Sequence, residues 1–474
     1  MAAISTRAHE RRRAGMSQFR RMSPVDTLQL RTESLSTPTH IGGLCVIEAG
    51  PLLDARGELD LAMIARRLDA RLTRTPELRH IIMLTPPLGG PPVWVDDPHF
   101  SISHHIHTRA APPPGDEASL LDTAELLLRP LLDRSRPPWE LWLITGLEGG
   151  RLGLLFKLHH VLADGLAAVA LMSSFFDLAP DAPDPPVERW RPVPAPSHRA
   201  LIVDNLQRRM RELAAVFDHP LQTARAVASA AAYSSRTLSQ WNAAPHTSLN
   251  RLVRPGRFLR EMRLDLETVR AVAHAHGATV NDVVITLVDH GVRALLAERS
   301  DPAQRADLIV GMPVTFRRAG AARAWGNAVG AFVARLPAGD DAAGRRLERV
   351  SASLRAAKAE QPVSQRNTAL ALGLVGWLAT RGISFNDHQR MINFLVSDLV
   401  GPAKPLYVLG ARIEDIFPVI GLSGNITLTC VAMSYCGRLT LMTIADRTAC
   451  PDIDTFTSGM RKSWDELAQV ASPI

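Results

Sequence analysis

The residues best suited to chemistry in this sequence lie at positions 159–165, in the order His-His-Val-Leu-Ala-Asp-Gly. A histidine side chain has an unperturbed pKa near ~6.5, so it can take up and return a proton at neutral pH. Such a side chain can act as a general base toward a hydroxyl group. His159 and His160 are adjacent, and Asp164 and Gly165 follow within a short turn. If the chain is an enzyme, we expect its chemistry here.

Two predicted strands lead into this motif. Residues 152–160 are short and apolar, which predicts a buried strand, and residues 140–147 predict a partner strand. The Glu-Gly-Gly segment at 148–150 favours a hairpin between them. Side chains of neighbouring strand residues point to opposite faces. We therefore expect His159 and His160 to play different parts, one facing a packed interior and the other facing an opening.

A predicted helix follows the motif. Residues 166–176 suit a helix that packs back onto the strand, and Gly165 permits a tight turn or a close backbone approach before it. A histidine at a strand end, beside the start of a helix, is well placed to act as a base.

Composition predicts a globular protein with more than one core. The chain has 474 residues, of which 46% are hydrophobic and 21% charged, so two domains are expected. The net charge is +7, and the basic residues gather visibly only in an N-terminal tail at 1–21. That tail suits either a solvated segment or an anionic membrane surface. Nucleic acid is not an expected partner, because only 5% of the residues are aromatic and no binding motif is present.

Cysteine usage and hydropathy indicate a cytoplasmic protein. The four cysteines have no CxxC spacing, and the first 22 residues lack the apolar core of a secretory signal. Met1, Met16 and Met22 are all possible start positions. No apolar run reaches the ~18 residues that would span a bilayer. Residues 369–380 suit a core helix or a surface that touches lipid.

The chain divides into three parts after the tail. Residues 22–179 predict an N-terminal α/β domain that carries the histidine motif. Residues 180–244 begin with a segment in which seven of seventeen residues are proline, and continue as helices that bridge the domains. Residues 245–474 again alternate strands and helices. We expect two α/β domains with a shared cleft.

A second group of histidines lies at residues 100–108, which alternate and predict another strand. On a strand His105 and His107 would share a face, beside His104, so a metal site is conceivable. No further cysteine, aspartate or glutamate has a spacing that would complete it. We predict no metal, and expect these histidines to be packed or exposed strand residues.

In the second half, residues 278–299 predict a strong helix. Thr279 and Asp282 have the spacing of a capping box, which gives Asp282 a purely structural explanation. Asn281, between them, has no such explanation, and we expect that it reaches a cleft.

These motifs together resemble one family. The HHxxxDG pattern at 159–165 is similar to that of CoA-dependent acyltransferases, including chloramphenicol acetyltransferase-like proteins and peptide synthetase condensation domains. The further segments that occur in the order seen in bacterial wax ester synthase/diacylglycerol acyltransferases are MSPVD at 22–26, LDRSRPPWELW at 132–142, NDVV at 281–284, MPVTFR at 312–317, GNAVG at 326–330 and PLYVLGAR at 405–412. The resemblance runs from about residue 22 to the C-terminus. Pro138 and Asp398 stand where that family usually has leucine and asparagine.

The resemblance implies two chloramphenicol acetyltransferase-like domains with the active site in a channel between them. It implies acyl transfer from acyl-CoA, a co-substrate rather than a bound cofactor, to diacylglycerol or a long-chain alcohol. His160 would be the general base, His159 would shape the site, and Asp164 would brace the Gly165 turn through an ion pair. Asn281 and Asp282 would support the site from the second domain. A peripheral position on a membrane or lipid-droplet surface is also implied.

Other functions stay open at this point. A member of the family that kept the fold as a catalytically silent lipid-binding protein would have the same architecture. A condensation enzyme acting on carrier-protein-bound substrates would share the HHxxxDG motif, but no carrier domain adjoins it here. For acyl transfer, the oxyanion would need donors, either the Asn281 side chain or backbone N–H groups near the motif. We also expect a sizeable apolar cleft for the two lipid chains.

Overall fold

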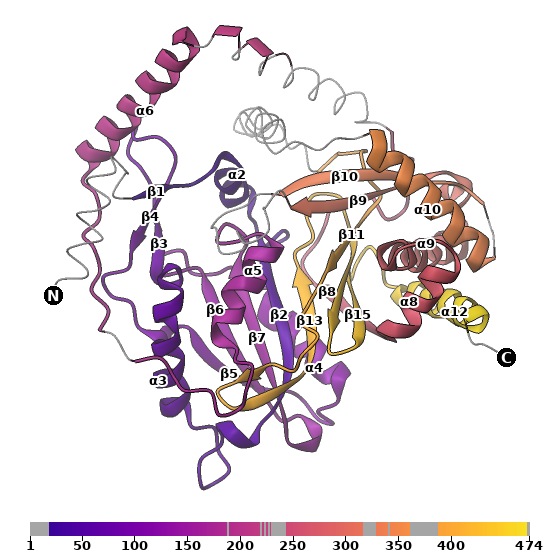
Figure 1. The fold of residues 1–474 in the computed structure, drawn as a ribbon, viewed down its shortest axis with the longest axis horizontal. Coiled ribbons are helices and arrows are strands. Elements are labelled where there is room, and N and C mark those ends of the chain that lie inside the picture. The colour runs from indigo at the N-terminus through magenta and orange to yellow at the C-terminus, as the bar shows by residue number, and fades with distance from the viewer. Residues whose placement is uncertain are drawn as a thin grey trace.

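A computed structural model describes most of the chain. The described residues are 19–186, 189–218, 220–221, 224–225, 228, 243–315, 329–339, 342–360 and 387–471. The basic segment up to residue 18 and the apolar segment 369–380 lie outside them. Within them the chain forms two sheet-rich domains set side by side (Figure 1).

The first domain is built on a sheet of six strands in the described residues. Its order is β12-β13-β2-β7-β6-β5. The strands are β2 (His40–Glu48), β5 (Ile106–Ala110), β6 (Trp139–Thr145), β7 (Arg151–His159), β12 (Tyr407–Val408) and β13 (Ala411–Ile420). The predicted hairpin is confirmed: β6 and β7 pair antiparallel, from Trp139 opposite Leu158 to Ile144 opposite Gly153.

A smaller sheet lies beside this one, in the order β1-β4-β3. It consists of β1 (Arg20–Arg21), β3 (His80–Met83) and β4 (Val93–Asp96). The helices of the first domain are α2 (Pro24–Thr32), α3 (Leu61–Arg71), α4 (Glu117–Leu128) and α5 (Gly165–Met172). The predicted helix at 166–176 therefore starts as expected but ends earlier, and a 3-10 turn at Ser173–Phe175 follows it.

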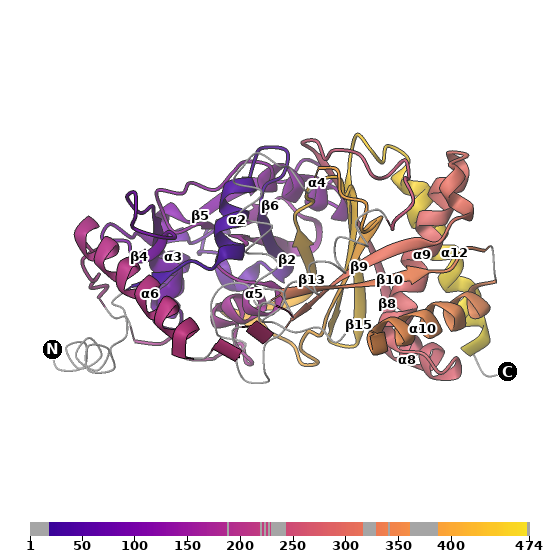
Figure 2. The same ribbon diagram turned by 90° about the horizontal axis from the view of Figure 1, so that it is seen from above.

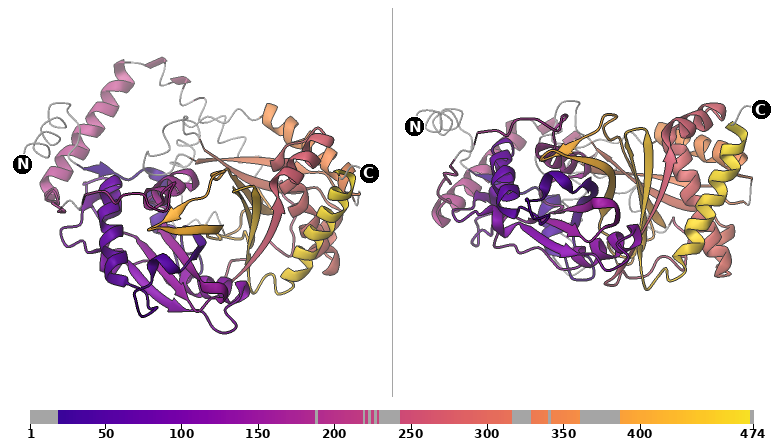
Figure 3. Two further views of the ribbon diagram at one scale, coloured as in Figure 1. Left: turned by 60° about the horizontal axis from the view of Figure 1, so that its bottom comes forward. Right: turned by 90° about the horizontal axis from the view of Figure 1, so that it is seen from below.

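The second domain has a sheet of six described strands in the order β10-β9-β11-β14-β15-β8. The strands are β8 (Arg257–Asp265), β9 (Leu308–Thr315), β10 (Val329–Leu336), β11 (Phe394–Leu399), β14 (Leu428–Tyr435) and β15 (Arg438–Asp446). Its helices are α8 (Leu266–Ala275), α9 (Val280–Glu298), α10 (Ala343–Glu360) and α12 (Ile453–Ala471). Figure 2 and Figure 3 show these helices on the face of the sheet that points away from the first domain.

Two neighbouring strands of the second half, β12 and β13, join the sheet of the first domain. β13 pairs antiparallel with β2, with Phe417 opposite Leu44 and Ile420 opposite Ile41. The sequence did not indicate this exchange, because β13 carries no local signal for its partner. It ties residues 411–420 to the sheet that ends in the histidine motif, so the C-terminal half helps to build the N-terminal domain.

The two domains share an apolar core. The inward face of β2, represented by Leu44 and Val46, packs with Leu259, Val431 and Met442 of the second sheet. The opposite face of the first sheet packs on α3 and α5, whereas the opposite face of the second packs on α8, α9, α10 and α12. The junction is therefore buried and apolar, and burial of such surface drives association of the two sheets.

The expected strand at 100–108 is wrong in its first half. Residues Ile102–His104 form a 3-10 turn, and β5 begins only at Ile106. His105 is buried and stacks on Trp139, while the His107 ring lies tilted against Trp142. These tryptophans lie at odd and even positions of β6, on opposite faces, so the two histidines do not share a face. Among the described residues, no group of three or more His, Cys, Asp or Glu side chains could hold a metal ion.

The proline-rich segment forms an extended strap on the first domain. Asp184 binds Arg67 and Arg71, and Trp190 donates its indole N–H to the Asp97 carbonyl at 2.9 Å. After this strap, α6 (His198–Asp218) leads toward the second domain. No helix in the described part of the chain is long and apolar enough to cross a membrane.

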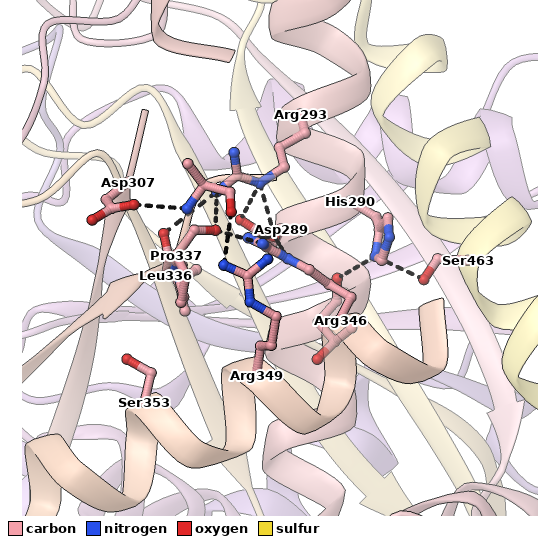
Figure 4. Close-up of polar contacts among 12 residues, drawn as sticks. Asp289, His290, Arg293, Asp307, Leu336, Pro337, Arg346, Arg349, Ser353 and Ser463 are labelled. Carbon is pink, nitrogen blue, oxygen red and sulfur yellow. Dashed lines mark hydrogen bonds and ion pairs between the residues drawn. The ribbon is translucent and has the colours of Figure 1, made fainter. Parts of the chain in front are cut away.

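A buried ion cluster stabilises the outer layer of the second domain. Asp289 of α9 accepts from Arg293 at 3.1 Å and from Arg346 Nε of α10 at 2.7 Å (Figure 4). The two arginines also donate to the carbonyl groups of Leu336 and Pro337, at the end of β10. Because these donors already have protein acceptors, we assign the cluster to architecture rather than to chemistry.

Candidate functional site

The two histidines of the motif have different surroundings. β7 ends at His159, which is fully buried and lies opposite His40 of β2. The His159 N–H donates to the Pro138 carbonyl at 3.0 Å, just before β6. His160 follows in a turn and is half-buried. The strand end therefore places one imidazole in the interior and leaves the other partly open.

The contacts of His159 define its tautomer. The Val161 backbone N–H donates to Nδ1 at 3.2 Å, so Nδ1 must carry a lone pair. In the neutral ring the proton then sits on Nε2, which lies 3.3 Å from the Glu33 Oε2 atom. His159 is thus held between its own turn and a buried carboxylate, with no route to a substrate.

Glu33 anchors this buried group. Its carboxylate accepts the Thr39 backbone N–H at 3.1 Å and also binds the Arg134 guanidinium. Burial alone would raise the pKa of Glu33, but His159, Arg134 and the Thr39 N–H outweigh it and lower the pKa to about 2. Glu33 is therefore an anion at neutral pH, fixed beneath the motif.

His160 is tied to the same segment through its backbone. Its N–H donates to the Thr39 carbonyl at 2.8 Å, so Thr39 connects Glu33 to His160. The His160 Nδ1 atom lies 3.5 Å from the side-chain amide of Gln29, on α2. A half-buried imidazole with a fixed backbone and one nitrogen near an amide can present its other nitrogen as a proton acceptor.

Asp164 and Gly165 begin α5. The Asp164 carboxylate accepts the Ala167 N–H at 3.0 Å as the N-cap, and its carbonyl accepts the Ala168 N–H at 2.7 Å. Asp164 is fully buried, which suits a structural brace. Gly165 is the first helical residue, and a Cβ atom there would lie 3.6 Å from Leu399 Cδ2 of β11, an ordinary contact. The expected steric need for glycine is therefore not found, and the motif instead adjoins the second domain at this point.

A second buried pair lies behind His159. His40 Nδ1 donates to the Leu128 carbonyl at 3.1 Å, and Lys157 Nζ donates to the Leu127 and Pro130 carbonyls at 3.1 and 2.7 Å. These contacts satisfy carbonyl groups at the C-terminal end of α4. Burial, followed by the charge of Lys157, lowers the pKa of His40 to about 3, so His40 is neutral at physiological pH.

We expect His40 to make the protein sensitive to mild acid. A histidine in the unfolded chain has a pKa of ~6.5. Below that pH the unfolded chain binds a proton at His40, whereas the folded chain does not. Because the folded pKa is lower, stability is lost as pH falls below ~6.5. The midpoint of thermal unfolding should drop between pH 6.5 and 5, and His40→Asn should flatten that slope. Circular dichroism follows the thermal unfolding at each pH. If the midpoint of His40→Asn falls with pH as steeply as that of the wild type, the assignment to His40 is contradicted.

A small, partly open pocket is lined by residues of both domains. The first domain contributes His40, Leu128 and Val419, and the second contributes Leu259 and Ile444. The lining is mostly apolar, but the pocket is small, so the sizeable cleft expected for two lipid chains stays a prediction. The pocket reaches the buried group at His40, whereas His160 lies outside it.

The contacts of the predicted supporting residue Asp282 lie within the second domain. Thr279 and Asp282 form the expected capping box, and Ser351 of α10 also donates to Asp282 at 3.0 Å. α9 packs on the outer face of the second sheet. Asp282 therefore has an architectural place, and a role of Asn281 in the site stays a prediction.

Sequence reasoning missed Glu33, Gln29 and His40. Glu33 ends α2, and His40 starts β2, so each sits at an element boundary where polar residues are common. The separations of 126 residues from Glu33 to His159 and 131 from Gln29 to His160 leave no periodic signal. Only the resemblance of residues 22–26 to the family pointed toward this segment.

Comparison with known proteins agrees with this architecture. Residues 22–284 match the wax ester synthase/diacylglycerol acyltransferase catalytic domain, and residues 325–468 match the WS/DGAT C-terminal domain. A Mycobacterium bovis protein named as a diacylglycerol O-acyltransferase is 29% identical over 468 residues, covering 94% of this chain and 98% of its own.

Solved structures share the fold. The wax ester synthase/diacylglycerol acyltransferase from Marinobacter aquaeolei VT8 has a TM-score of 0.69 at 24% identity, covering 95% of this chain and all of its own. A starter condensation domain of rhizomide synthetase has a TM-score of 0.60 at 14% identity, covering 97% and 96%. The fold of two chloramphenicol acetyltransferase-like domains is thereby confirmed. With both of its domains matched, the chain belongs to the wax ester synthase/diacylglycerol acyltransferase family of acyl-CoA-dependent O-acyltransferases.

Proposed function

We propose that the chain transfers a long-chain acyl group from acyl-CoA to the hydroxyl group of diacylglycerol, forming triacylglycerol, with His160 as the general base. The observation that carries the proposal is the half-buried imidazole at the end of β7, whose backbone is held by Thr39 above a buried anion. Membership of the family supplies the reaction class, and the name of the M. bovis relative favours diacylglycerol as the acceptor.

The reaction needs one base and one acid in sequence. His160 takes the hydroxyl proton as the alcohol oxygen forms a bond to the thioester carbon, giving a tetrahedral intermediate. When this intermediate collapses, the carbon–sulfur bond breaks and the CoA thiolate takes the proton from the His160 imidazolium. A positioned base of this kind contributes on the order of 10²–10⁴-fold to the rate. No covalent acyl-enzyme is required.

The remaining motif residues hold that base in place. His159 and Asp164 shape the turn, and Gln29 lies close enough to Nδ1 to orient the ring. The structure places the Gln29 side-chain nitrogen toward Nδ1; with the amide turned so that its carbonyl oxygen faces Nδ1, Gln29 would accept the ring proton and leave the Nε2 lone pair for the substrate. Backbone N–H groups near the motif, or the Asn281 side chain, would donate hydrogen bonds to the oxyanion of the tetrahedral intermediate.

The interdomain pocket suits an apolar chain. Its lining includes Leu128, Leu259 and Ile444, and an acyl chain buried there would help to hold acyl-CoA between the domains, with the thioester extending beyond the pocket toward His160. The rhizomide synthetase domain was solved with C8-CoA, so that related fold binds an acyl-CoA. We propose acyl-CoA as the co-substrate here, with no other cofactor, and a cytoplasmic protein peripherally associated with a membrane or lipid-droplet surface.

A product assay tests the function directly. The purified protein is incubated with radiolabelled palmitoyl-CoA and with diolein, hexadecanol or neither, and the neutral lipids are separated on a thin-layer plate. We expect labelled triacylglycerol with diolein. Wax ester with hexadecanol, in place of triacylglycerol, would instead identify a wax ester synthase, and the absence of any product would favour a catalytically silent lipid-binding protein.

A further inference from the structure

Helix α6 carries an apolar stripe that is exposed among the described residues of the protein. Seven large apolar side chains on and just beyond this helix are between 43% and 81% exposed. They are Val203, Leu206, Met210, Leu213, Val216, Phe217 and Leu221. At 3.6 residues per turn, the spacing of residues 203, 206, 210, 213 and 217 places them in one line along the helix. Single exposed apolar residues are common, but a continuous line marks an interaction surface.

The opposite face of α6 is the one that docks on the protein. Leu201 is fully buried with Val93 and Val95 of β4. Arg21 Nε donates to Asp204 at 2.9 Å, and Asn205 donates to the Leu88 carbonyl at 2.8 Å. Residues 201 and 203 are two positions apart, which is a rotation of about 200° on a helix. The stripe therefore points away from the domain that anchors the helix.

Figure 1 shows where α6 lies on the molecule. The start of α6 lies against the small sheet of β1, β3 and β4, and the helix then extends outward beyond the first domain. The first turns are thus fixed, while the apolar side chains of the stripe are exposed along the length of the helix. A rigidly anchored helix with an outward stripe is well built for contact with a flat surface.

Charges beside the stripe indicate the nature of that surface. Arg209 and Arg211 are exposed and lie on the two sides of the line, at about 240° and 80° when Val203 is set at 0°. Arginines in such positions bury their aliphatic stems and extend their charged ends toward anionic headgroups. Each basic residue near an anionic bilayer strengthens binding about fivefold.

The same charges argue against a second copy of the chain. In a coiled coil with residues 203, 206, 210, 213 and 217 in the seam, the flanking positions would be Gln207, Arg209, Ala214 and Val216. No acidic residue among them could pair with Arg209. A stripe of two heptads is also shorter than the three or four that identify a coiled coil.

We propose that α6 is the element that docks this protein on an anionic phospholipid surface, with the stripe inserted between the headgroups. The proposed function explains only why such docking would be useful, because a diacylglycerol acceptor resides in a lipid surface. The stripe and its arginines are present whichever acceptor the enzyme uses.

The test is vesicle sedimentation of the full chain with phosphatidylcholine vesicles that contain 30% phosphatidylglycerol. The variant Leu206→Glu/Met210→Glu/Leu213→Glu removes the stripe at positions that the fold leaves exposed. The control Leu126→Glu/Leu178→Glu/Leu252→Glu makes the same charge change at exposed apolar residues elsewhere. We expect at least a tenfold loss of vesicle partitioning in the first variant and less than a twofold loss in the control.

A second pair of measurements identifies the partner. Arg209→Gln/Arg211→Gln should weaken binding to the anionic vesicles between five- and thirtyfold and leave weak binding to pure phosphatidylcholine unchanged. Equal partitioning of the stripe variant and the control overturns the proposal. A wild-type dimer in sedimentation equilibrium that the stripe variant loses, without vesicle binding, also overturns it in favour of a second copy.

Transfer activity separates this proposal from the proposed function. With diolein dispersed in detergent micelles, the stripe variant should keep wild-type activity, because α6 contributes no residue to the histidine site. A wild-type protein that binds vesicles but transfers no acyl group would contradict the function and leave the docking helix supported. Normal transfer without vesicle binding would overturn the docking helix alone.

Discussion

Replacing His160 with alanine is expected to lower kcat/KM for acyl transfer by on the order of 10²–10⁴-fold, because the alcohol then loses its proton acceptor. The side chain is half-buried at the end of β7, and its removal takes away little buried surface. The midpoint of thermal unfolding should therefore stay close to that of the wild type. Labelled palmitoyl-CoA and diolein at subsaturating concentrations provide the measurement.

Two other histidines serve as controls for this result. His104→Ala changes an exposed histidine and should leave transfer unaltered. His159→Ala should lower stability, since it removes the buried partner of Glu33, and a thermal shift will reveal this. If His160→Ala retains near-normal transfer while folding normally, the base has been assigned to the wrong residue.

Local chemistry explains which features the sequence could predict. The hairpin of β6 and β7, the helix after Asp164 and the capping box of Thr279 and Asp282 each arise from residues a few positions apart. Their side chains meet because of the period of a strand or a helix. Such features therefore lie at nearly the positions that the spacing of the residues predicts.

Features that join distant segments could not be predicted in that way. β13 completes the first sheet from residue 411 onward, and its pairing with β2 depends on the global topology. The 3-10 turn at Ile102–His104 broke the expected strand because His105 packs between Phe100 and Trp139, a tertiary contact. The family resemblance gave the architecture, but neither of these contacts.

In the candidate site, too, the features formed by nearby residues could be predicted and the contacts between distant segments could not. The motif predicted the base and the brace, but the carboxylate beneath them comes from α2, and its link to His160 passes through the Thr39 backbone. Glu33 touches no open space, so it is a positioning residue and not a catalytic one. Replacing Glu33 should therefore affect the reaction through the position of His160.

Glu33→Gln is expected to lower kcat by about 10²-fold, while KM for acyl-CoA stays within about threefold. Misplacement of a reacting group by a fraction of an ångström to one ångström costs about this much. Glutamine keeps the size of the side chain and an acceptor for the Thr39 N–H, but removes the negative charge facing His159 and Arg134. Loss of one member of a buried ion pair also costs about 3–5 kcal/mol of stability.

Asp177→Asn is the matched control, because Asp177 is a buried carboxylate that pairs with the buried Arg71, away from the motif. It should lose comparable stability without the fall in kcat. If both variants lose kcat equally, the effect of Glu33 is general destabilisation and not positioning of His160. Assays at a temperature well below both unfolding midpoints keep the comparison on folded protein.

The pH dependence supplies an independent check on Glu33. The folded pKa is lowered to about 2 from an ordinary value of 4.5, so its ion pairs contribute stability that is present above pH 4.5 and lost as pH falls toward 2. The difference corresponds to about 3 kcal/mol. Glu33→Gln should remove this acid-dependent part of the unfolding curve, while the part between pH 6.5 and 5 that we assign to His40 remains. Chemical denaturation at pH 6.5, 5 and 3 would measure both, and an acid slope in Glu33→Gln equal to that of the wild type would mean that Glu33 is not the buried anion beneath the motif.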